Sequence, residues 1–156
     1  WQTTVVDGRA NYATAARFPM AGKVVVAKPD AVLNHVSIDD QTVFLLMTHN
    51  YNYDLAMVRQ LVNTKAVYIG VLGPRKKFER MLSELKDEGI ELTKEQLSRI
   101  YNPIGLNIGA ETAEEIALSV LSEVQAVLSR RPGGSLRNEA TPIHERKKQE
   151  IKEVRL

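Results

Sequence analysis

Residues 66–81 read AVYIGVLGPRKKFERM, an apolar run that gives way to glycine and proline and then to three consecutive cations. The apolar part predicts a buried strand ending at Gly70, Gly73 and Pro74 break the chain, and Arg75–Lys77 stand where a helix should begin. Helix N-termini favour acidic side chains, because the backbone dipole is positive there. A bound anion would explain the cations, and so would a solvated first turn.

Composition limits the classes of protein to consider. A chain of 156 residues, 44% of them hydrophobic, predicts one domain that buries roughly 68–70% of its unfolded surface. The absence of cysteine excludes disulfides, Cys-ligated zinc and a Cys nucleophile within this chain, and agrees with a cytoplasmic location. No apolar run approaches the ~20 residues of a transmembrane helix, and the opening residues lack a signal-peptide pattern, so we expect no membrane association.

The net charge of +2 hides an asymmetry. The chain from Ser129 onward is basic, whereas the preceding part is mildly acidic, which does not favour nucleic-acid binding. Proline and glycine in residues 131–135 predict a packed domain over 1–131 and a charged tail over 132–156. Attraction between tail and body predicts a homo-oligomer with tail contacts.

Hydrophobic periodicity predicts alternating strands and helices. Strands are expected at 3–7, 23–27, 42–48 and 66–72; helices at 54–62 and 76–89; helices opened by capping boxes at 93–101 and 112–131; and short helical segments at 11–18 and 29–36. In the last helix, a core stripe is expected at Ile116, Val120, Leu121, Val124, Val127 and Leu128. This order predicts an α/β fold with a doubly wound, mostly parallel, Rossmann-like sheet.

Ligands of such sheets bind beyond the carboxyl ends of the strands. Those ends carry Asp7–Arg9, Lys28–Asp30, Thr48–Asn50 and Gly70–Arg75. An Asp that closes a strand is typical of dinucleotide folds, where it follows a glycine loop by about 20 residues. That loop and its strand are absent before Asp7, so we expect the central strand to be missing and a gap to separate strands 3–7 and 42–48.

Four segments together carry a family resemblance. VVDGRANYATAARFP (5–19), MTHNYNYD (47–54), YIGVLGPRKKFERML (68–82) and NPIGLNIGAETAEEIALSVLSEV (102–124) resemble the C-terminal Rossmann domain of the XdhC/CoxI family, the xanthine dehydrogenase accessory proteins. The resemblance runs from about Val5 to Val124. Family members usually carry an N-terminal domain and a GxGH-type loop, which this chain lacks, so we expect it to be a fragment or one piece of a split protein.

The resemblance implies an accessory factor that binds the molybdenum cofactor, of the molybdopterin type, for sulfuration and insertion into molybdenum hydroxylases. A hydroxylase apoenzyme and a cysteine desulfurase would then be partners, and a cofactor chaperone is expected rather than a stand-alone enzyme. Two alternatives remain open: an NAD(P)-binding oxidoreductase domain, although no Y-x-x-x-K pattern occurs, and a non-catalytic interaction domain.

Candidate residues near the first strands each have a functional and a structural interpretation. Asp7 could accept a ribose or pterin hydrogen bond or shape a turn, and Arg9 could hold phosphate or pair with Asp7. Thr48 and His49 could contact the ligand, or His49 could cap the next helix. Asp54 is expected to be a helix residue stabilised by the dipole. His35 and His144 are expected at the surface; the histidine spacing predicts no metal site.

The later candidates lie in glycine-containing loops. Gly70 and Gly73 could let backbone amides approach an anion, and Arg75 offers a planar fork for phosphate. Lys76 and Lys77 are expected to face solvent. Gly105 belongs to an irregular loop before the last helix, where a ligand contact and a tight structural turn are both open.

Overall fold

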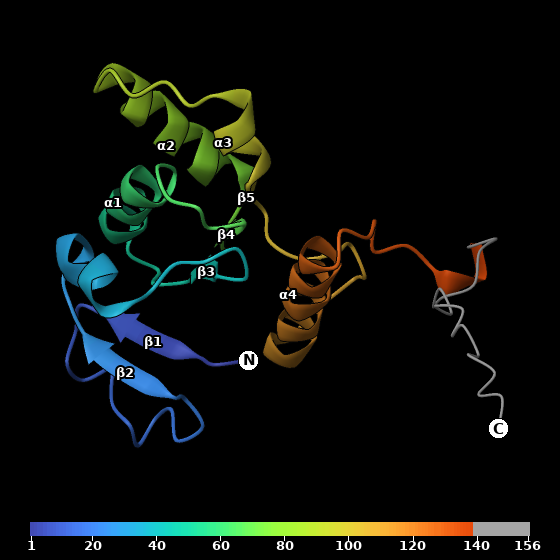
Figure 1. Cartoon of the computed structure of the whole chain (residues 1–156), viewed down its shortest axis with the longest axis horizontal. Coiled ribbons are helices and arrows are strands. Elements are labelled where there is room, and N and C mark those ends of the chain that lie inside the picture. Colours follow the sequence, from blue (N-terminus) through green and yellow to red (C-terminus); the bar gives the residue numbers. More distant parts are fainter. Residues whose placement is uncertain (139–156) are drawn as a thin grey trace, which may run out of the picture.

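The structure, a computed structural model, describes residues 1–138 and has an α/β architecture (Figure 1). The predicted tail therefore lies largely outside the described residues, as does His144, and the tail contacts stay predictions. Every strand pair is parallel, as expected for a doubly wound fold. The strands are β1 (Thr4–Asp7), β2 (Lys23–Val26), β3 (Val43–Leu46), β4 (Tyr68–Val71) and β5 (Ile100–Tyr101).

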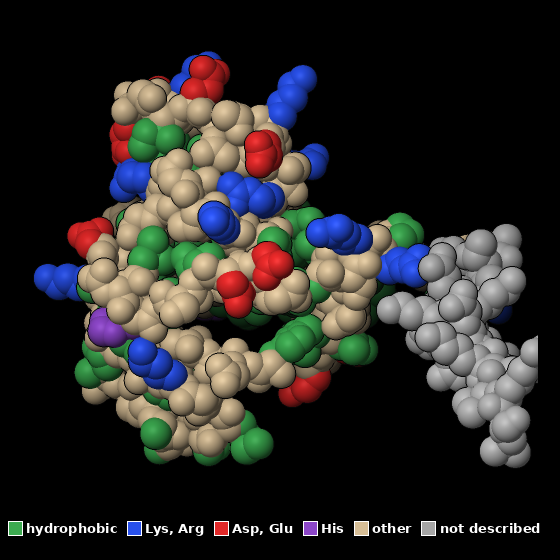
Figure 2. Space-filling view, in the orientation of Figure 1, with side chains coloured by type: hydrophobic (Ala, Val, Ile, Leu, Met, Phe, Trp, Pro, Cys, Tyr) green, Lys and Arg blue, Asp and Glu red, His purple; other side chains and the backbone are tan. Residues whose placement is uncertain are grey.

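The strands form two separate sheets, β1-β2 and β3-β4-β5. Within residues 1–138 no strand pairs with the free edges of β1 and β3, which confirms the predicted gap between them. Figure 2 shows an opening between the β1–β2 part of the molecule and the rest. A strand order with the open position between β1 and β3 matches a doubly wound sheet whose central strand is absent.

Helices cover both faces of the three-stranded sheet. The helical segments of the described residues are η1 (Pro29–His35), α1 (Tyr51–Leu61), α2 (Arg75–Asp87), α3 (Lys94–Ser98), α4 (Ala113–Leu128) and η2 (Leu136–Asn138). Ile69 packs in one apolar cluster with residues of α1 and α2, whereas the adjacent Tyr68 packs with Val120 and Val124 of α4. Successive strand residues point to opposite faces, so α4 covers the face opposite to α1 and α2. None of the described helices has the length and apolar character of a bilayer crossing.

Local signals explain several helix ends. The predicted capping boxes are present at Thr93 and Thr112, each with reciprocal side-chain and backbone hydrogen bonds to the residue three positions on. Gly89 has a φ of 82° just beyond α2, as the residue after a helix C-cap often does. These contacts satisfy backbone groups that helix termini otherwise leave unpaired.

Three predictions about elements are wrong. Residues 11–18 form turns rather than a helix. Ile100 and Tyr101 form β5 rather than the end of a helix, because they pair with β4 and the Tyr101 ring stacks on Tyr68 with centroids 4.2 Å apart. Leu121 is 45% exposed rather than in the core. It follows the buried Val120 by about 100° around the helix, which turns it away from the sheet.

Gly70 lies inside β4, not at its end, and is buried. A Cβ on Gly70 would come within 2.7 Å of the Tyr68 ring and 2.8 Å of Ile104. Close packing of the sheet therefore accounts for this glycine without a ligand, and its place inside the strand agrees with the strand predicted at 66–72.

Gly70→Ala is expected to lower the free energy of unfolding by about 1–3 kcal/mol, because overpacking forces neighbouring side chains to shift. Gly134→Ala is the matched control, since a Cβ there meets nothing within 4 Å. Urea unfolding of both variants measures the difference, and equal midpoints would contradict the packing explanation.

Candidate functional site

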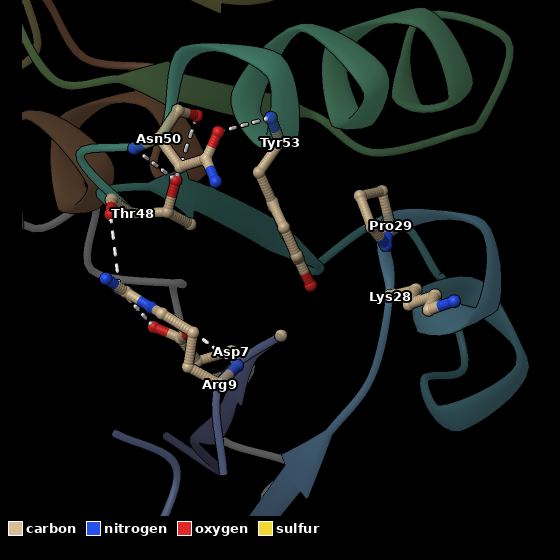
Figure 3. Close-up of a pocket in the computed structure, with 8 residues that line it drawn as sticks. Asp7, Arg9, Lys28, Pro29, Thr48, Asn50 and Tyr53 are labelled. Atoms are coloured by element: carbon tan, nitrogen blue, oxygen red, sulfur yellow. Dashed lines mark hydrogen bonds and ion pairs between the residues drawn. The ribbon is translucent and has the colours of Figure 1, made fainter. Parts of the chain in front are cut away.

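The carboxyl ends of β1, β2 and β3 border a cavity of about 220 Å³ (Figure 3). Its lining comes from the segments after these strands and from the start of α1: Asp7, Gly8, Arg9, Lys28, Pro29, Thr48, Asn50 and Tyr53. Three predicted site residues, Asp7, Arg9 and Thr48, are thus brought together. Parallel strands place their carboxyl ends at one edge, which is why residues far apart in sequence meet here.

Asp7 and Arg9 form a bidentate ion pair at the carboxyl end of β1. The Arg9 Nε and Nη2 atoms donate to Asp7 Oδ1 and Oδ2, each at 2.9 Å, and the Arg9 backbone N–H also donates to Oδ1 at 2.9 Å. The Asp7 side chain is 17% exposed and the Arg9 side chain 49%. The side-chain hydrogen bonds from Arg9 hold the pKa of the Asp7 carboxyl below its ordinary value. The contribution of this pair is therefore present above the ordinary pKa and lost as the pH falls through the lowered one.

Arg9 also reaches across the gap between the two sheets. Its Nη2 atom lies 3.4 Å from the Thr48 carbonyl oxygen, beyond β3. Its guanidinium carbon stands 3.9 Å from the centroid of the Tyr12 ring, a cation–π contact. Arg9 therefore pairs with Asp7, which was one of the two roles that the sequence left open for it. Its guanidinium also stacks on the exposed ring of Tyr12.

The opposite wall of the cavity is held by α1. The Asn50 side chain caps this helix by accepting from the Tyr53 backbone N–H at 3.2 Å. The Tyr53 hydroxyl donates to the Ala27 carbonyl at 2.8 Å, beyond β2. A Cβ on Gly8 would lie 3.1 Å from the Tyr53 ring, so glycine lets the tyrosine pack closely. These contacts fix a flat aromatic wall opposite Asp7 (Figure 3).

A buried ion pair lies behind Thr48. The side chain of Asp54 is fully buried and accepts from Thr48 Oγ1 at 2.7 Å and from Lys77 Nζ at 2.7 Å. Lys77 also donates to the Leu72 carbonyl at 3.1 Å. The prediction that Lys77 faces solvent is therefore wrong, and Asp54 is more than a residue stabilised by the helix dipole. Lys77 is the third residue of α2, which turns it toward the sheet, whereas Arg75 and Lys76 are exposed.

The other predicted residues do not line the cavity. His49 is exposed, with a φ of 54° that places it in the turn between Thr48 and the helix cap. Gly73 has a φ of 122° and lies two residues before α2. Gly105 donates its backbone N–H to Glu123 at 2.8 Å, and a Cβ there would lie 2.4 Å from Ser119 Oγ, so a tight structural turn explains it. Arg75 and Gly73 share the carboxyl edge with the cavity but remain predictions as ligand contacts.

The strand-end rule placed Lys28, Pro29 and Asn50 at the predicted edge, although none of them was named as a ligand contact. Tyr53 was missed, since its orientation depends on where α1 begins. Among residues 1–138 there is no cluster of three or more His, Asp or Glu side chains that could hold a metal ion.

Arg9→Ala is expected to raise the pKa of Asp7 toward its ordinary value of 3.8, because the largest cause of the lowered pKa is the Arg9 hydrogen bond. NMR titration of the Asp7 carboxyl carbon measures the change. Arg17→Ala serves as control and should change the Asp7 pKa less, because Arg17 contacts Tyr12 and lowers that pKa only through its charge, the smallest of the causes. An unchanged Asp7 titration in Arg9→Ala would contradict the observed pairing.

Lys77→Met is expected to lower the free energy of unfolding by about 3–5 kcal/mol, because it leaves the buried Asp54 carboxylate without its cation. Lys76→Met, one residue away and exposed, is the matched control and should leave the unfolding midpoint unchanged. Denaturant unfolding compares the two. Equal losses would show that Lys77 contributes no more than a surface charge.

Known proteins give an independent view of this arrangement. A Bacillus subtilis protein, named as a probable subunit of xanthine dehydrogenase, is 34% identical over 77% of this chain and 34% of its own length. The Escherichia coli molybdenum cofactor insertion chaperone PaoD is 32% identical over 58% of this chain and 28% of its own length. A crystal structure of a xanthine dehydrogenase from Bacillus halodurans aligns with a TM-score of 0.71 and 28% identity, over 83% of this chain and 38% of that one.

The chain thus spans about a third of the length of the relatives that it matches. The fold of the solved relative agrees with the parallel, Rossmann-like architecture described above. The family defined as the XdhC Rossmann domain matches residues 1–124, which include every strand, the cavity lining and most of α4. This chain therefore belongs to the XdhC Rossmann domain family.

Proposed function

We propose that this domain binds the molybdenum cofactor as cargo, in a protein that matures molybdenum hydroxylases of the xanthine dehydrogenase type. The names of its relatives support the role. The observation that carries the proposal is the cavity at the carboxyl edge of the strands, which is lined by the carboxylate of Asp7, the guanidinium of Arg9 and the ring of Tyr53, with Lys28 at its border. Once delivered, the cofactor supplies the redox chemistry of the client hydroxylase.

The residues at the cavity fit the chemistry of a phosphorylated pterin. Asp7 offers carboxylate oxygens to ring N–H groups, while Arg9 and Lys28 offer positive charge to a phosphate. Tyr53 and Pro29 supply apolar walls for a planar ring. The volume of about 220 Å³ lies below the ~300–1,000 Å³ of pockets that enclose whole ligands, so this cavity suits one ring system of a larger molecule.

The finer parts of the role belong to the same proposal. The cofactor is held for terminal sulfuration, with a cysteine desulfurase as partner, and is then inserted into a hydroxylase apoenzyme. The protein acts in the cytoplasm and as a homo-oligomer. The anionic end of the cofactor extends along the carboxyl edge toward Gly73 and Arg75, with His49 near the ring.

One observation favours a second candidate, an NAD(P)-binding domain. Asp7 closes β1, the position from which a dinucleotide fold contacts a ribose diol. In this structure the same carboxylate is engaged by Arg9. Nicotinamide absorbance in the purified protein would support this candidate, and pterin fluorescence with molybdenum would support the first.

The decisive experiment purifies the full-length protein from cells that make the cofactor and measures bound molybdenum and pterin. Transfer is then tested by reactivation of a molybdenum hydroxylase apoenzyme. Lys28→Ala and Arg75→Ala should each weaken cofactor binding roughly 10- to 150-fold, the worth of a charge-assisted hydrogen bond. Lys76→Ala is the matched control and should bind like wild type. Lys77→Ala is unsuitable, since it would disturb the buried pair with Asp54.

Protein that carries neither pterin nor molybdenum and does not reactivate the apoenzyme would overturn the proposed function. Cofactor binding that survives in Arg75→Ala but falls in Lys28→Ala would confine the anion site to the cavity and remove Arg75 from it.

A further inference from the structure

The Asp7 carboxylate is occupied by a particular kind of donor. Both of its oxygens accept N–H groups from one planar guanidinium, at 2.9 Å each, in the fork geometry of an arginine–carboxylate pair. Two N–H groups on one planar N–C–N unit also form the edge of a 2-aminopyrimidin-4-one ring, where the ring N–H stands beside the exocyclic amine. Guanine and pterin both carry this edge. The Arg9 guanidinium therefore presents the same pair of N–H donors as that ring edge.

We infer that Asp7 is the acceptor for the 2-aminopyrimidinone edge of a pterin, and that Arg9 occupies this acceptor in the free protein and is displaced by the ligand. The inference rests on the proposed function. It adds Asp7 as the residue that recognises the ring and Arg9 as the residue that competes with the ring for Asp7. The hydrogen bonds balance: two N–H donors of Arg9 leave the carboxylate and two N–H donors of the ring replace them, while the positive charge of Arg9 moves away from Asp7.

The two partners differ in how firmly they are held. The side chain of Asp7 is only 17% exposed, and the backbone N–H of Arg9 donates to its Oδ1 atom at 2.9 Å, which orients the carboxylate even when the guanidinium leaves. The side chain of Arg9 is 49% exposed, and its remaining hydrogen bond, to the Thr48 carbonyl, is long at 3.4 Å. Exposed ion pairs contribute little to stability, so separating the Arg9 guanidinium from Asp7 costs little free energy.

The displaced guanidinium keeps a place at the site. Its stacking on Tyr12 does not depend on Asp7, so Arg9 can stay on the ring while it turns its fork outward. A guanidinium fork binds phosphate oxygens in the same two-pronged way as a carboxylate. One residue therefore blocks the ring site when the protein is empty and is free to hold the anionic part of the ligand when it is full.

The cavity favours a flat ring over a sugar at Asp7. The Tyr53 ring packs against Gly8 and lines the cavity opposite the Asp7 carboxylate, and Pro29 adds a second apolar surface. A ribose diol could also offer two donors, but it would leave these flat walls without a planar partner.

The test uses the full-length protein with two fluorescent probes, 6-hydroxymethylpterin and 6-hydroxymethyllumazine, which differ by a 2-amino group against a 2-oxo group. Wild type should bind the pterin about 10-fold more tightly, the worth of one hydrogen bond to a charged acceptor. Asp7→Asn should abolish the discrimination, because a carboxamide presents only one acceptor oxygen. Circular dichroism and the unfolding midpoint establish that the variant is folded.

Arg9 gives the sharper result. Arg9→Ala should bind 6-hydroxymethylpterin several-fold more tightly than wild type, because the internal competitor is gone. Arg9→Lys, which keeps the charge but lacks the fork, should do the same. Arg17→Ala is the matched control: it also removes an arginine from Tyr12 but not from Asp7, and should bind like wild type. Relative to wild type, Arg9→Ala should gain less affinity for a phosphorylated pterin than for the uncharged probe, because the guanidinium that would hold the phosphate is gone.

Three results would overturn the inference: equal affinity of wild type for pterin and lumazine, weaker pterin binding in Arg9→Ala, or Asp7-dependent binding of AMP in place of pterin. These failures are separable from failure of the proposed function. Molybdenum cofactor retained equally by wild type and Asp7→Asn removes this inference alone. Pterin discrimination without molybdenum or apoenzyme reactivation removes the proposed function alone.

Discussion

The fully buried carboxylate of Asp54 is the constraint on which the site depends. A charge without solvent must be compensated by fixed partners, and here they are Lys77 of α2 and Thr48 beyond β3. The requirement ties the start of two helices to the end of a strand. The carbonyl of the same Thr48 faces Arg9, which holds Asp7 beyond β1. A continuous series of polar contacts thus runs from α2 across the gap between the sheets.

This series connects the two sheets in the free protein, although their strands do not pair with each other. β1 and β3 are not paired to each other, so their relative position at the carboxyl edge relies on side chains. Arg9 bridges to Thr48 on one side of the cavity, and Tyr53 reaches the Ala27 carbonyl on the other. Both bridges end on backbone carbonyls beyond strands, and they add to the apolar cluster that Val6, Val25 and Ala27 share with Leu46 and Ile69.

The sequence predicted those features that follow from the order of apolar strands. Parallel strands share one carboxyl edge, so the sequence brought Asp7, Arg9 and Thr48 together, and an Asp without a glycine loop predicted that β1 and β3 do not pair. Features that depend on rotation about an axis could not be predicted. The inward turn of Lys77, the outward turn of Leu121 and the choice of Tyr53 as a wall are each set by where a helix begins.

The three cations at the start of α2 also separate into what the sequence could predict and what depends on the rotation of the helix. Their residue types suggested an anion, yet one of them, Lys77, already has its anion in Asp54 from the neighbouring helix. A cation at a helix N-terminus is unfavourable by itself, and a buried carboxylate beside it offsets that cost. Only Arg75 and Lys76 remain exposed. Whatever attraction this end of α2 has for a ligand must therefore come from these two side chains and from backbone amides, while the third cation, Lys77, serves the fold.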